Sequence, residues 1–247
     1  PQTVHFFKKM PKGEYDLKRV YWWEKRWRES VTHPQQPQEV IFKGNVVSNP
    51  QQGSDRNGDF DLDFDLIYIG GALGVIHAAV MALKGYRVLL VERLPFGRMN
   101  REWNISRDEF QSLINLGLFT LEEFESVIAA EYIDGFSKFF DAYNPPHLKA
   151  AVLHTPKVLN VAIDAEKLLR FCGDKLRQAG GEIWDETEFL RADVSEREVT
   201  VKLTHLPTKT SKQASARLLI DAMGTASPIA WQLNGGRDRK STRLNSS

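Results

Sequence analysis

Two almost continuous apolar runs mark the most regular part of this chain. Residues 64–69 read FDLIYI and residues 88–91 read VLLV, as expected for parallel strands that are buried on both faces. Between them, apolar residues recur at helical spacing from Leu73 to Lys84, and Gly85 suits the C-terminal cap of this helix. The helix is expected to face the sheet with five apolar residues: Val75, Ile76, Ala79, Val80 and Leu83. The pattern predicts a strand–helix–strand unit of an α/β fold.

A glycine turn joins the first strand to this helix. It contains Gly70, Gly71 and Gly74, but in the pattern G-x-G-x-x-G the second glycine is replaced by Ala72 and the third by Val75. Such a turn lets the backbone approach a pyrophosphate, and the following helix directs free N–H groups at the anion. The same residues also suit an ordinary crossover in which the glycines only make the turn.

An acidic residue follows the second strand. Glu92 stands directly after VLLV, at the position where a carboxylate can bind the two ribose hydroxyls of an adenosine. The turn and Glu92 together favour a bound FAD or NAD over a purely structural crossover.

Helix-start signals come next along the chain. Ser106 to Glu109 and Thr120 to Glu123 each have the sequence of a capping box. The second of these helices is expected to run to about Tyr132.

A second strand–helix–strand pattern occupies residues 158–184. A short strand at 158–163 is followed by Asp164, which can cap a helix, and Gly180 and Gly181 precede the strand at 182–184. Further elements are predicted beyond it: paired strands at 189–194 and 198–203, an exposed turn at 206–213, a final strand at 217–221 and a helix from about Pro228. Asp221 is expected to cap the backbone turn that follows the final strand.

Composition excludes several classes of function. The 247 residues have a formal net charge of +1, which gives no footprint for nucleic acid. No apolar run is long enough to cross a membrane. The single cysteine, Cys172, excludes a disulfide framework and a thiolate zinc site. The six histidines have no ligand spacing, so no metal site is predicted, and His77 is expected to be a buried helix residue with a hydrogen-bond partner.

The two ends of the chain differ from its middle. Residues 1–33 interleave aromatic and basic residues, which can stack on single-stranded nucleic acid. We favour an amphipathic helical segment that packs its aromatic residues on a neighbouring surface. Residues 34–62 contain several prolines and glutamines and read as a largely disordered linker, with a short strand at 39–42.

The last ten residues, 238–247, read DRKSTRLNSS. They match a translation of a common sequencing-library adapter, and we expect them to be an artefact tail outside the native fold. The domain at 63–237 is therefore expected to be incomplete at its C-terminus.

Three segments, in this order and spacing, resemble the FAD-binding domain of glutathione-reductase-type flavoproteins. The resemblance is to the branch that contains aromatic hydroxylases, geranylgeranyl reductases, flavin halogenases and lycopene cyclases. The segments are residues 65–93, 158–184 and 215–233. Together with the loop at 94–110, they are most similar to plant and cyanobacterial lycopene-cyclase-like proteins. The resemblance implies a three-layer, Rossmann-like FAD/NAD(P)-binding fold.

The resemblance also implies where FAD would bind. The pyrophosphate would lie over the turn, and Glu92 would bind the adenosine ribose. The implied contacts are Gly70, Gly71, Ala72 and Gly74 at the pyrophosphate, Arg93 and Val194 at the adenine, Arg101 and Arg107 at phosphate or the ribityl chain, and Gly224 near the cofactor. No candidate for a general acid or base stands out.

Three functions stay open at this point. The first is an FAD-dependent oxidoreductase of the monooxygenase or reductase type, with a small apolar substrate such as an isoprenoid and NAD(P)H as reductant. The second is a redox-neutral, lycopene-cyclase-like enzyme that uses FAD. The third is a non-catalytic nucleotide-binding protein, which the degenerate glycine turn favours. The resemblance further implies a chloroplast protein with peripheral membrane contact.

Overall fold

The computed structural model describes residues 2–11, 13–32, 36–44, 62–99 and 103–235. Arg101, the tail at 238–247 and most of the predicted linker lie outside the described residues. The chain forms two compact units, one from residues 1–40 and 228–247 and the other from residues 41–227.

A seven-stranded sheet organises the larger unit. Its strand order is β1-β10-β11-β12-β2-β3-β9. The four strands β12, β2, β3 and β9 run parallel, whereas β10, β11 and β12 pair antiparallel. The bounds of the strands are Ile41–Lys43 for β1, Phe64–Ile69 for β2, Val88–Val91 for β3, Glu182–Trp184 for β9, Thr187–Val194 for β10, Val199–His205 for β11 and Thr210–Asp221 for β12.

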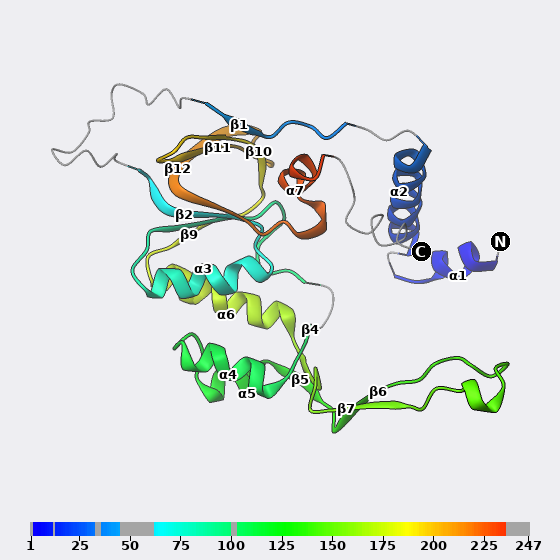
Figure 1. Ribbon diagram of the computed structural model, residues 1–247. Coiled ribbons are helices and arrows are strands. Elements are labelled where there is room, and N and C mark those ends of the chain that lie inside the picture. Colours follow the sequence, from blue (N-terminus) through cyan, green and yellow to red (C-terminus); the bar gives the residue numbers. More distant parts are fainter. Residues whose placement is uncertain (1, 12, 33–35, 45–61, 100–102, 236–247) are drawn as a thin grey trace. The chain divides into compact units, whose positions relative to one another are not determined.

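Two helices cover one face of the parallel strands. They are α3 (Leu73–Leu83) and α6 (Ala165–Gln178), and they lie side by side in Figure 1, with the antiparallel strands on the other side of β2 and β3. This arrangement confirms the predicted three-layer α/β fold. The predicted strand at residues 64–69, the helix from Leu73 and the strand at residues 88–91 are all confirmed.

The core between helices and sheet follows the apolar pattern closely. Tyr68 and Leu90 from the sheet pack in one cluster with Val75 of α3 and Leu169 of α6. The expected inward position of Leu83 is wrong, because that side chain is 49% exposed. The buried stripe of α3 passes through Val75, Ala78, Ala79 and Ala82, so Leu83 lies beside the stripe in the last turn.

A smaller sheet and two short helices follow β3. The helices are α4 (Arg107–Asn115) and α5 (Leu121–Val127), and the three strands are β4 (Trp103–Ile105), β8 (Val161–Ile163) and β5 (Ile128–Glu131), in that order. Both predicted capping boxes are present. The predicted extension of the second helix to Tyr132 is wrong, because residues 128–131 pair antiparallel with β8 instead. Ladder pairing with a distant strand overrides the local helical preference there.

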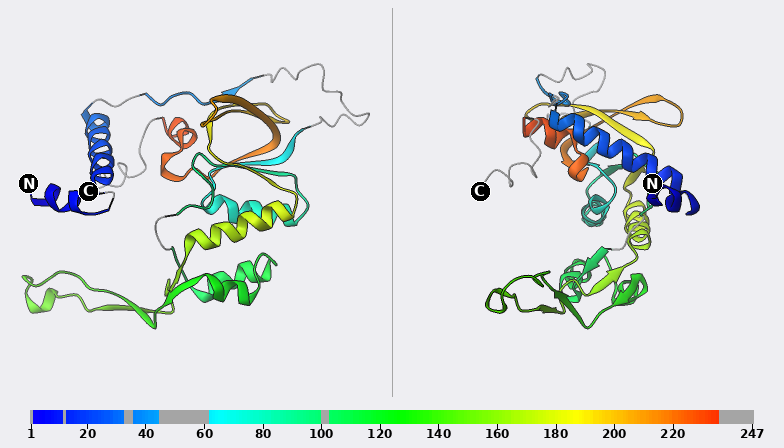
Figure 2. Two further views of the ribbon diagram at one scale, coloured as in Figure 1. Left: turned by 180° about the vertical axis from the view of Figure 1, so that it is seen from behind. Right: turned by 90° about the vertical axis from the view of Figure 1, so that its right-hand side faces the viewer.

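A two-stranded ribbon extends from this smaller sheet (Figures 1 and 2). It consists of β6 (Asp134–Ser137) and β7 (Leu153–Pro156), with a short 3-10 helix η1 (Pro146–Leu148) between them. The predicted strand at 158–163 is shorter than expected, since only Val161–Ile163 form β8. Leu159 has a φ of 48°, a left-handed conformation that does not continue a strand.

The late strands are longer than predicted. The pairing of β10 with β11 confirms the paired strands, and β12 includes the predicted strand at 217–221. The exposed turn predicted at 206–213 is confined to residues 206–209, because β12 starts at Thr210. Residues 210–216 of β12 pair with β11, and residues 216–221 pair with β2. One long strand therefore joins the antiparallel and parallel parts of the sheet.

The smaller unit contains three helices among the described residues: α1 (Gln2–Lys9), α2 (Gly13–Thr32) and α7 (Pro228–Leu233). In α2, Trp22 and Trp27 are exposed and the Arg26 guanidinium lies 4.8 Å from the Trp22 ring centre. In the described part of the chain, no helix has the length and apolarity needed to cross a membrane.

Cys172 gives a direct test of the core. Its side chain is buried in α6, and burial raises the pKa of its thiol to about 12. The thiolate is the reactive form, so native protein should react very slowly with a thiol-specific disulfide reagent at neutral pH. Denatured protein should react at once and release one equivalent of the reagent's thiol. Fast labelling of the native protein would contradict the packing of α6 against the sheet.

Candidate nucleotide-binding site

The glycine turn after β2 packs tightly against the segment that follows β12. The N–H of Ala222 donates to the carbonyl of Ile69 at 2.8 Å, which joins the ends of the two strands. Gly70 has a φ of 111°, and a Cβ there would lie 2.4 Å from the carbonyl oxygen of Ala222. A Cβ at Gly74 would lie 2.9 Å from the Cβ of Ala222. Both glycines are therefore needed for backbone conformation and close packing.

The N-terminus of α3 is open to an anion. Ala72 precedes the helix, no side chain caps it, and its first turn contains no acidic residue. The first N–H groups of an α-helix have no intrahelical partner and carry partial positive charge, which is the basis of phosphate binding at helix N-termini. Val75 at the third glycine position is fully buried in the core, so this replacement is compatible with packing of the helix on the sheet.

Glu92 at the end of β3 is aimed back at the turn. One carboxylate oxygen accepts from the Gly71 N–H at 2.7 Å, and the other accepts from the Leu94 N–H at 2.9 Å. A Cβ at Gly71 would lie 3.1 Å from the Glu92 Oε2 atom and 3.2 Å from the Phe96 ring. The carboxylate is only partly buried, so lone pairs remain for further donors such as ribose hydroxyls.

The turn after β12 is held by an aspartate, as the sequence predicted. The Asp221 carboxylate accepts from the Met223 N–H at 3.1 Å and from the Ser227 hydroxyl. Gly224 follows with a φ of 64°, a conformation that glycine adopts without strain. The structure thus brings together the glycine turn, Glu92 and the segment containing Gly224.

Arg93 and Val194 have different environments. The Arg93 guanidinium, next to Glu92, lies 3.9 Å from the Glu188 carboxylate. Val194 lies at the far end of β10, where its carbonyl accepts from the Gly44 N–H at 3.3 Å. The near end of β10 is the one beside Glu92, because the Thr187 N–H donates to the Glu92 carbonyl at 2.9 Å. The two ends of this eight-residue strand are seven residue steps apart, about 23 Å at about 3.3 Å per step.

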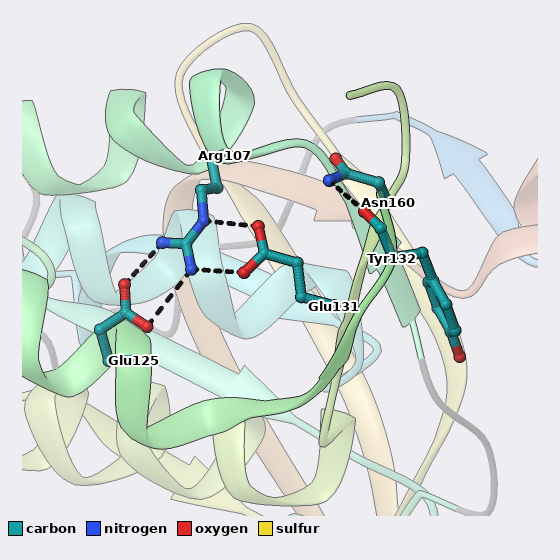
Figure 3. Close-up of polar contacts among 5 residues, drawn as sticks. All are labelled: Arg107, Glu125, Glu131, Tyr132 and Asn160. Atoms are coloured by element: carbon teal, nitrogen blue, oxygen red, sulfur yellow. Dashed lines mark hydrogen bonds and ion pairs between the residues drawn. The ribbon is translucent and has the colours of Figure 1, made fainter. Parts of the chain in front are cut away.

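Arg107 is engaged by two carboxylates (Figure 3). Its guanidinium donates to both oxygens of Glu131, at 2.8 and 2.7 Å, and also to Glu125. These ion pairs raise the pKa of Arg107, with the Glu131 hydrogen bonds as the largest cause, and they link α4, α5 and β5. The role of Arg107, like that of Arg93, Val194 and Arg101, as a cofactor contact stays a prediction.

The Arg107 network should make stability depend on pH. Its hydrogen bonds lower the pKa of Glu131, so the pairing stabilises the fold above the ordinary glutamate pKa, about 4.3, and is lost as the pH falls through the lower folded value. Arg107→Ala should therefore reduce the free energy of unfolding at neutral pH and have a much smaller effect in strong acid. Urea unfolding at both pH values measures this difference. Lys202→Ala is the control. This substitution also removes a cation beside a carboxylate, but the Lys202 ammonium lies 3.9 Å from Asp193, which is too far for a hydrogen bond. An equal effect of Arg107→Ala at both pH values would contradict the ion-pair interpretation.

The sequence did not identify the partners in two contacts near the turn. The Phe96 ring packs against Gly71 and against Gly173 of α6. The backbone N–H of Phe96 donates to the Asp185 carboxylate at 3.1 Å. The Tyr68 hydroxyl lies 2.7 Å from Nδ1 of His77, and burial raises the pKa of Tyr68 to about 12. His77 has the predicted hydrogen-bond partner, but the prediction that it is buried is wrong: its position in α3 is exposed.

Solved structures of flavoproteins share this fold. The flavin-dependent halogenase CmlS is 20% identical over 70% of this chain and 32% of its own, with a TM-score of 0.55. Aklavinone-11 hydroxylase, solved with FAD and aklavinone, is 21% identical over 70% and 35%, with a TM-score of 0.54. A flavoprotein/dehydrogenase from Cytophaga hutchinsonii is 14% identical over 68% and 42%, with a TM-score of 0.53.

These similarities define the class of fold. The larger unit has the Rossmann-like fold of flavoprotein FAD-binding domains, as the sequence predicted. This chain spans between 32% and 42% of the length of those three structures. No family model matches the sequence, and no curated protein is similar to it.

Proposed function

We propose that this chain is the FAD-binding part of an FAD-dependent oxidoreductase. The observation that carries the proposal is the convergence at one edge of the sheet of the uncapped N-terminus of α3, the glycine turn and the Glu92 carboxylate. An anion and a pair of vicinal hydroxyls are the two features that such a site recognises, and the ADP half of FAD carries both.

The residues present fit this group. Gly71 leaves open the space in which a Cβ would press on Glu92 and Phe96, and no side chain makes a capping hydrogen bond at the N-terminus of α3. In the proposed complex, Gly70, Gly71, Ala72 and Gly74 line the pyrophosphate and Glu92 orients the adenosine ribose. Arg93, Arg101, Arg107, Val194 and Gly224 are proposed as further contacts, on the sequence resemblance.

The protein's part in the reaction would be binding and orientation. When bound, the isoalloxazine ring supplies the redox chemistry, as is general for flavoenzymes. Glu92 and the turn would fix the adenosine end, and the Asp221 turn would hold the backbone near Gly224 in place. NAD(P)H is proposed as the reductant and a small apolar molecule as the substrate. Aklavinone-11 hydroxylase, which shares this fold, was solved with FAD and the small molecule aklavinone, and this supports a small-molecule substrate.

A finer placement rests on the sequence alone. The resemblance of residues 65–93, 158–184 and 215–233 to lycopene-cyclase-like plant proteins supports an isoprenoid substrate and a chloroplast location. A redox-neutral reaction of that kind would use bound FAD without net consumption of NAD(P)H.

Purified protein tests the proposal directly. The native full-length product should be yellow, release FAD on denaturation at close to one equivalent, and bleach when NAD(P)H is added without oxygen. Protein that is colourless and does not take up FAD would overturn the proposal and favour a non-catalytic role. A third outcome would support the cyclase-like alternative. In it, the protein binds FAD and NAD(P)H does not reduce this flavin, but the protein converts an isoprenoid without redox change.

A further inference from the structure

The segment that follows β3 is hydrogen-bonded to the turn between β9 and β10. This turn, residues 184–187, is here called the clamp, and the segment that it holds is residues 92–96. The Glu92 N–H donates to the Trp184 carbonyl at 3.0 Å, and the Thr187 N–H donates back to the Glu92 carbonyl at 2.9 Å. The clamp therefore fixes both backbone groups of the residue whose carboxylate is the proposed ribose acceptor.

Asp185 is the member of the clamp that acts through its side chain. Its carboxylate accepts from the Phe96 N–H at 3.1 Å, a hydrogen bond to an ionised acceptor, which is stronger than one between neutral groups. The Asp185 carbonyl accepts from the Thr187 hydroxyl at 2.8 Å, and Thr187 is buried. Asp185 is thus held by a fixed neighbour while it holds the far end of the segment after β3.

The backbone of the clamp is strained. Glu186 has a φ of 47°, in the left-handed region that residues with a Cβ rarely adopt. Its N–H donates to the Leu94 carbonyl at 3.3 Å, and its carbonyl accepts from the Leu206 N–H at 2.7 Å. Such a conformation costs energy, persists only where its surroundings hold it, and is concentrated at functional sites. The strain beside residues 92–96 therefore favours a positioning role for the clamp over that of a simple connection.

Phe96 connects Asp185 to the glycine turn. A Cβ at Gly71 would lie 3.2 Å from the Phe96 ring, and a Cβ at Gly173 would lie 2.3 Å from it, so the ring is wedged between the turn and α6. The Gly71 N–H donates to the Glu92 carboxylate at 2.7 Å. Because Asp185 fixes the backbone of Phe96, it also fixes the ring that packs beside the Glu92–Gly71 contact.

From these contacts we infer that Asp185 is a positioning residue of the nucleotide site. It holds residues 92–96 so that the Glu92 carboxylate meets Gly71 before any ligand arrives, with lone pairs left for the ribose hydroxyls. Binding then needs no reordering of this segment, and a site organised in advance binds more tightly. The inference rests on the proposed function, and Asp185 acts through Glu92 without touching the nucleotide.

Titration of the native full-length apoprotein with FAD tests the inference. Asp185→Ala should raise the FAD dissociation constant about tenfold, and Asp185→Asn, which keeps an acceptor oxygen for the Phe96 N–H, should raise it less than about threefold. The matched control is Asp63→Ala. The Asp63 carboxylate also accepts from a backbone N–H, that of Ser215 at 2.8 Å, but it precedes β2, at the opposite end of this strand from the glycine turn. Asp63→Ala should leave the FAD dissociation constant unchanged.

A double-mutant cycle separates positioning from a general loss of stability. In the Glu92→Ala background, Asp185→Ala should change the FAD dissociation constant less than about twofold, because the carboxylate that it positions is gone. An equal effect in both backgrounds would overturn the inference. A loss in Asp185→Asn as large as that in Asp185→Ala would overturn it as well.

Hydrogen exchange gives a readout that needs neither a substitution nor FAD. In the unsubstituted apoprotein, the Phe96 amide should exchange at least about a hundredfold more slowly than in an unstructured peptide of the same sequence. Exchange at the peptide rate would overturn the inference. Full-length protein that binds no FAD would overturn the proposed function, whereas FAD binding that Asp185→Ala leaves unchanged would overturn only the role of Asp185.

Discussion

Gly70→Ala is expected to lower the free energy of unfolding by about 3 kcal/mol, as the sum of backbone strain of about 1–3 kcal/mol and of overpacking of similar size. The φ of 111° is unfavourable for any residue with a Cβ, and the new methyl would lie 2.4 Å from the Ala222 carbonyl oxygen. That oxygen belongs to the backbone joined to β2 by the Ala222–Ile69 hydrogen bond, so it cannot move away alone. For a domain of this size, the loss corresponds to a decrease in Tm of about 6–12 °C.

Gly85→Ala is the matched control for this prediction. Gly85 also has a positive φ, 89°, but no atom lies within 4 Å of its would-be Cβ. Only the strain remains, and the cost is expected to be about 1 kcal/mol. Urea unfolding of both variants separates strain from steric overlap. If the two variants were equally stable, the close contact between the turn and Ala222 would not hold in solution.

Glu92→Ala is expected to weaken FAD binding about thirtyfold, from the loss of about 2 kcal/mol of hydrogen bonding. The substitution removes the acceptor for the Gly71 and Leu94 N–H groups, so the turn loses the contact that orients it. In the proposed complex it also leaves the ribose hydroxyls without their acceptor. Titration of the apoprotein with FAD, monitored through the quenching of flavin fluorescence, measures the change in the FAD dissociation constant.

A control carboxylate lies on the neighbouring strand. Glu182 in β9 accepts from the Trp184 indole at 2.9 Å and is exposed, so Glu182→Ala should leave the FAD dissociation constant unchanged. Unchanged FAD affinity in Glu92→Ala, with normal stability, would refute the assignment of Glu92 to the ribose.

Local signals in the sequence were enough to place the strand–helix–strand unit and the helix starts. The apolar runs at residues 64–69 and 88–91 have the pattern of strands buried on both faces, and the capping boxes at Ser106 and Thr120 act within four residues. Asp221 likewise satisfies groups within its own turn, at Met223 and Ser227. Such features depend on neighbours along the chain, which is why they could be predicted.

The sequence by itself therefore determined the class of fold, the glycine turn and the position of Glu92. Only the tertiary structure decided that residues 128–131 are a strand, that Ala222 packs on the turn, and that Val194 lies at the far end of β10. It also decided that Arg107 is shared by Glu125 and Glu131. The reason is the range of the interactions: ladder pairing, close backbone approach and ion pairs join segments that are distant in sequence, and no local pattern records their partners.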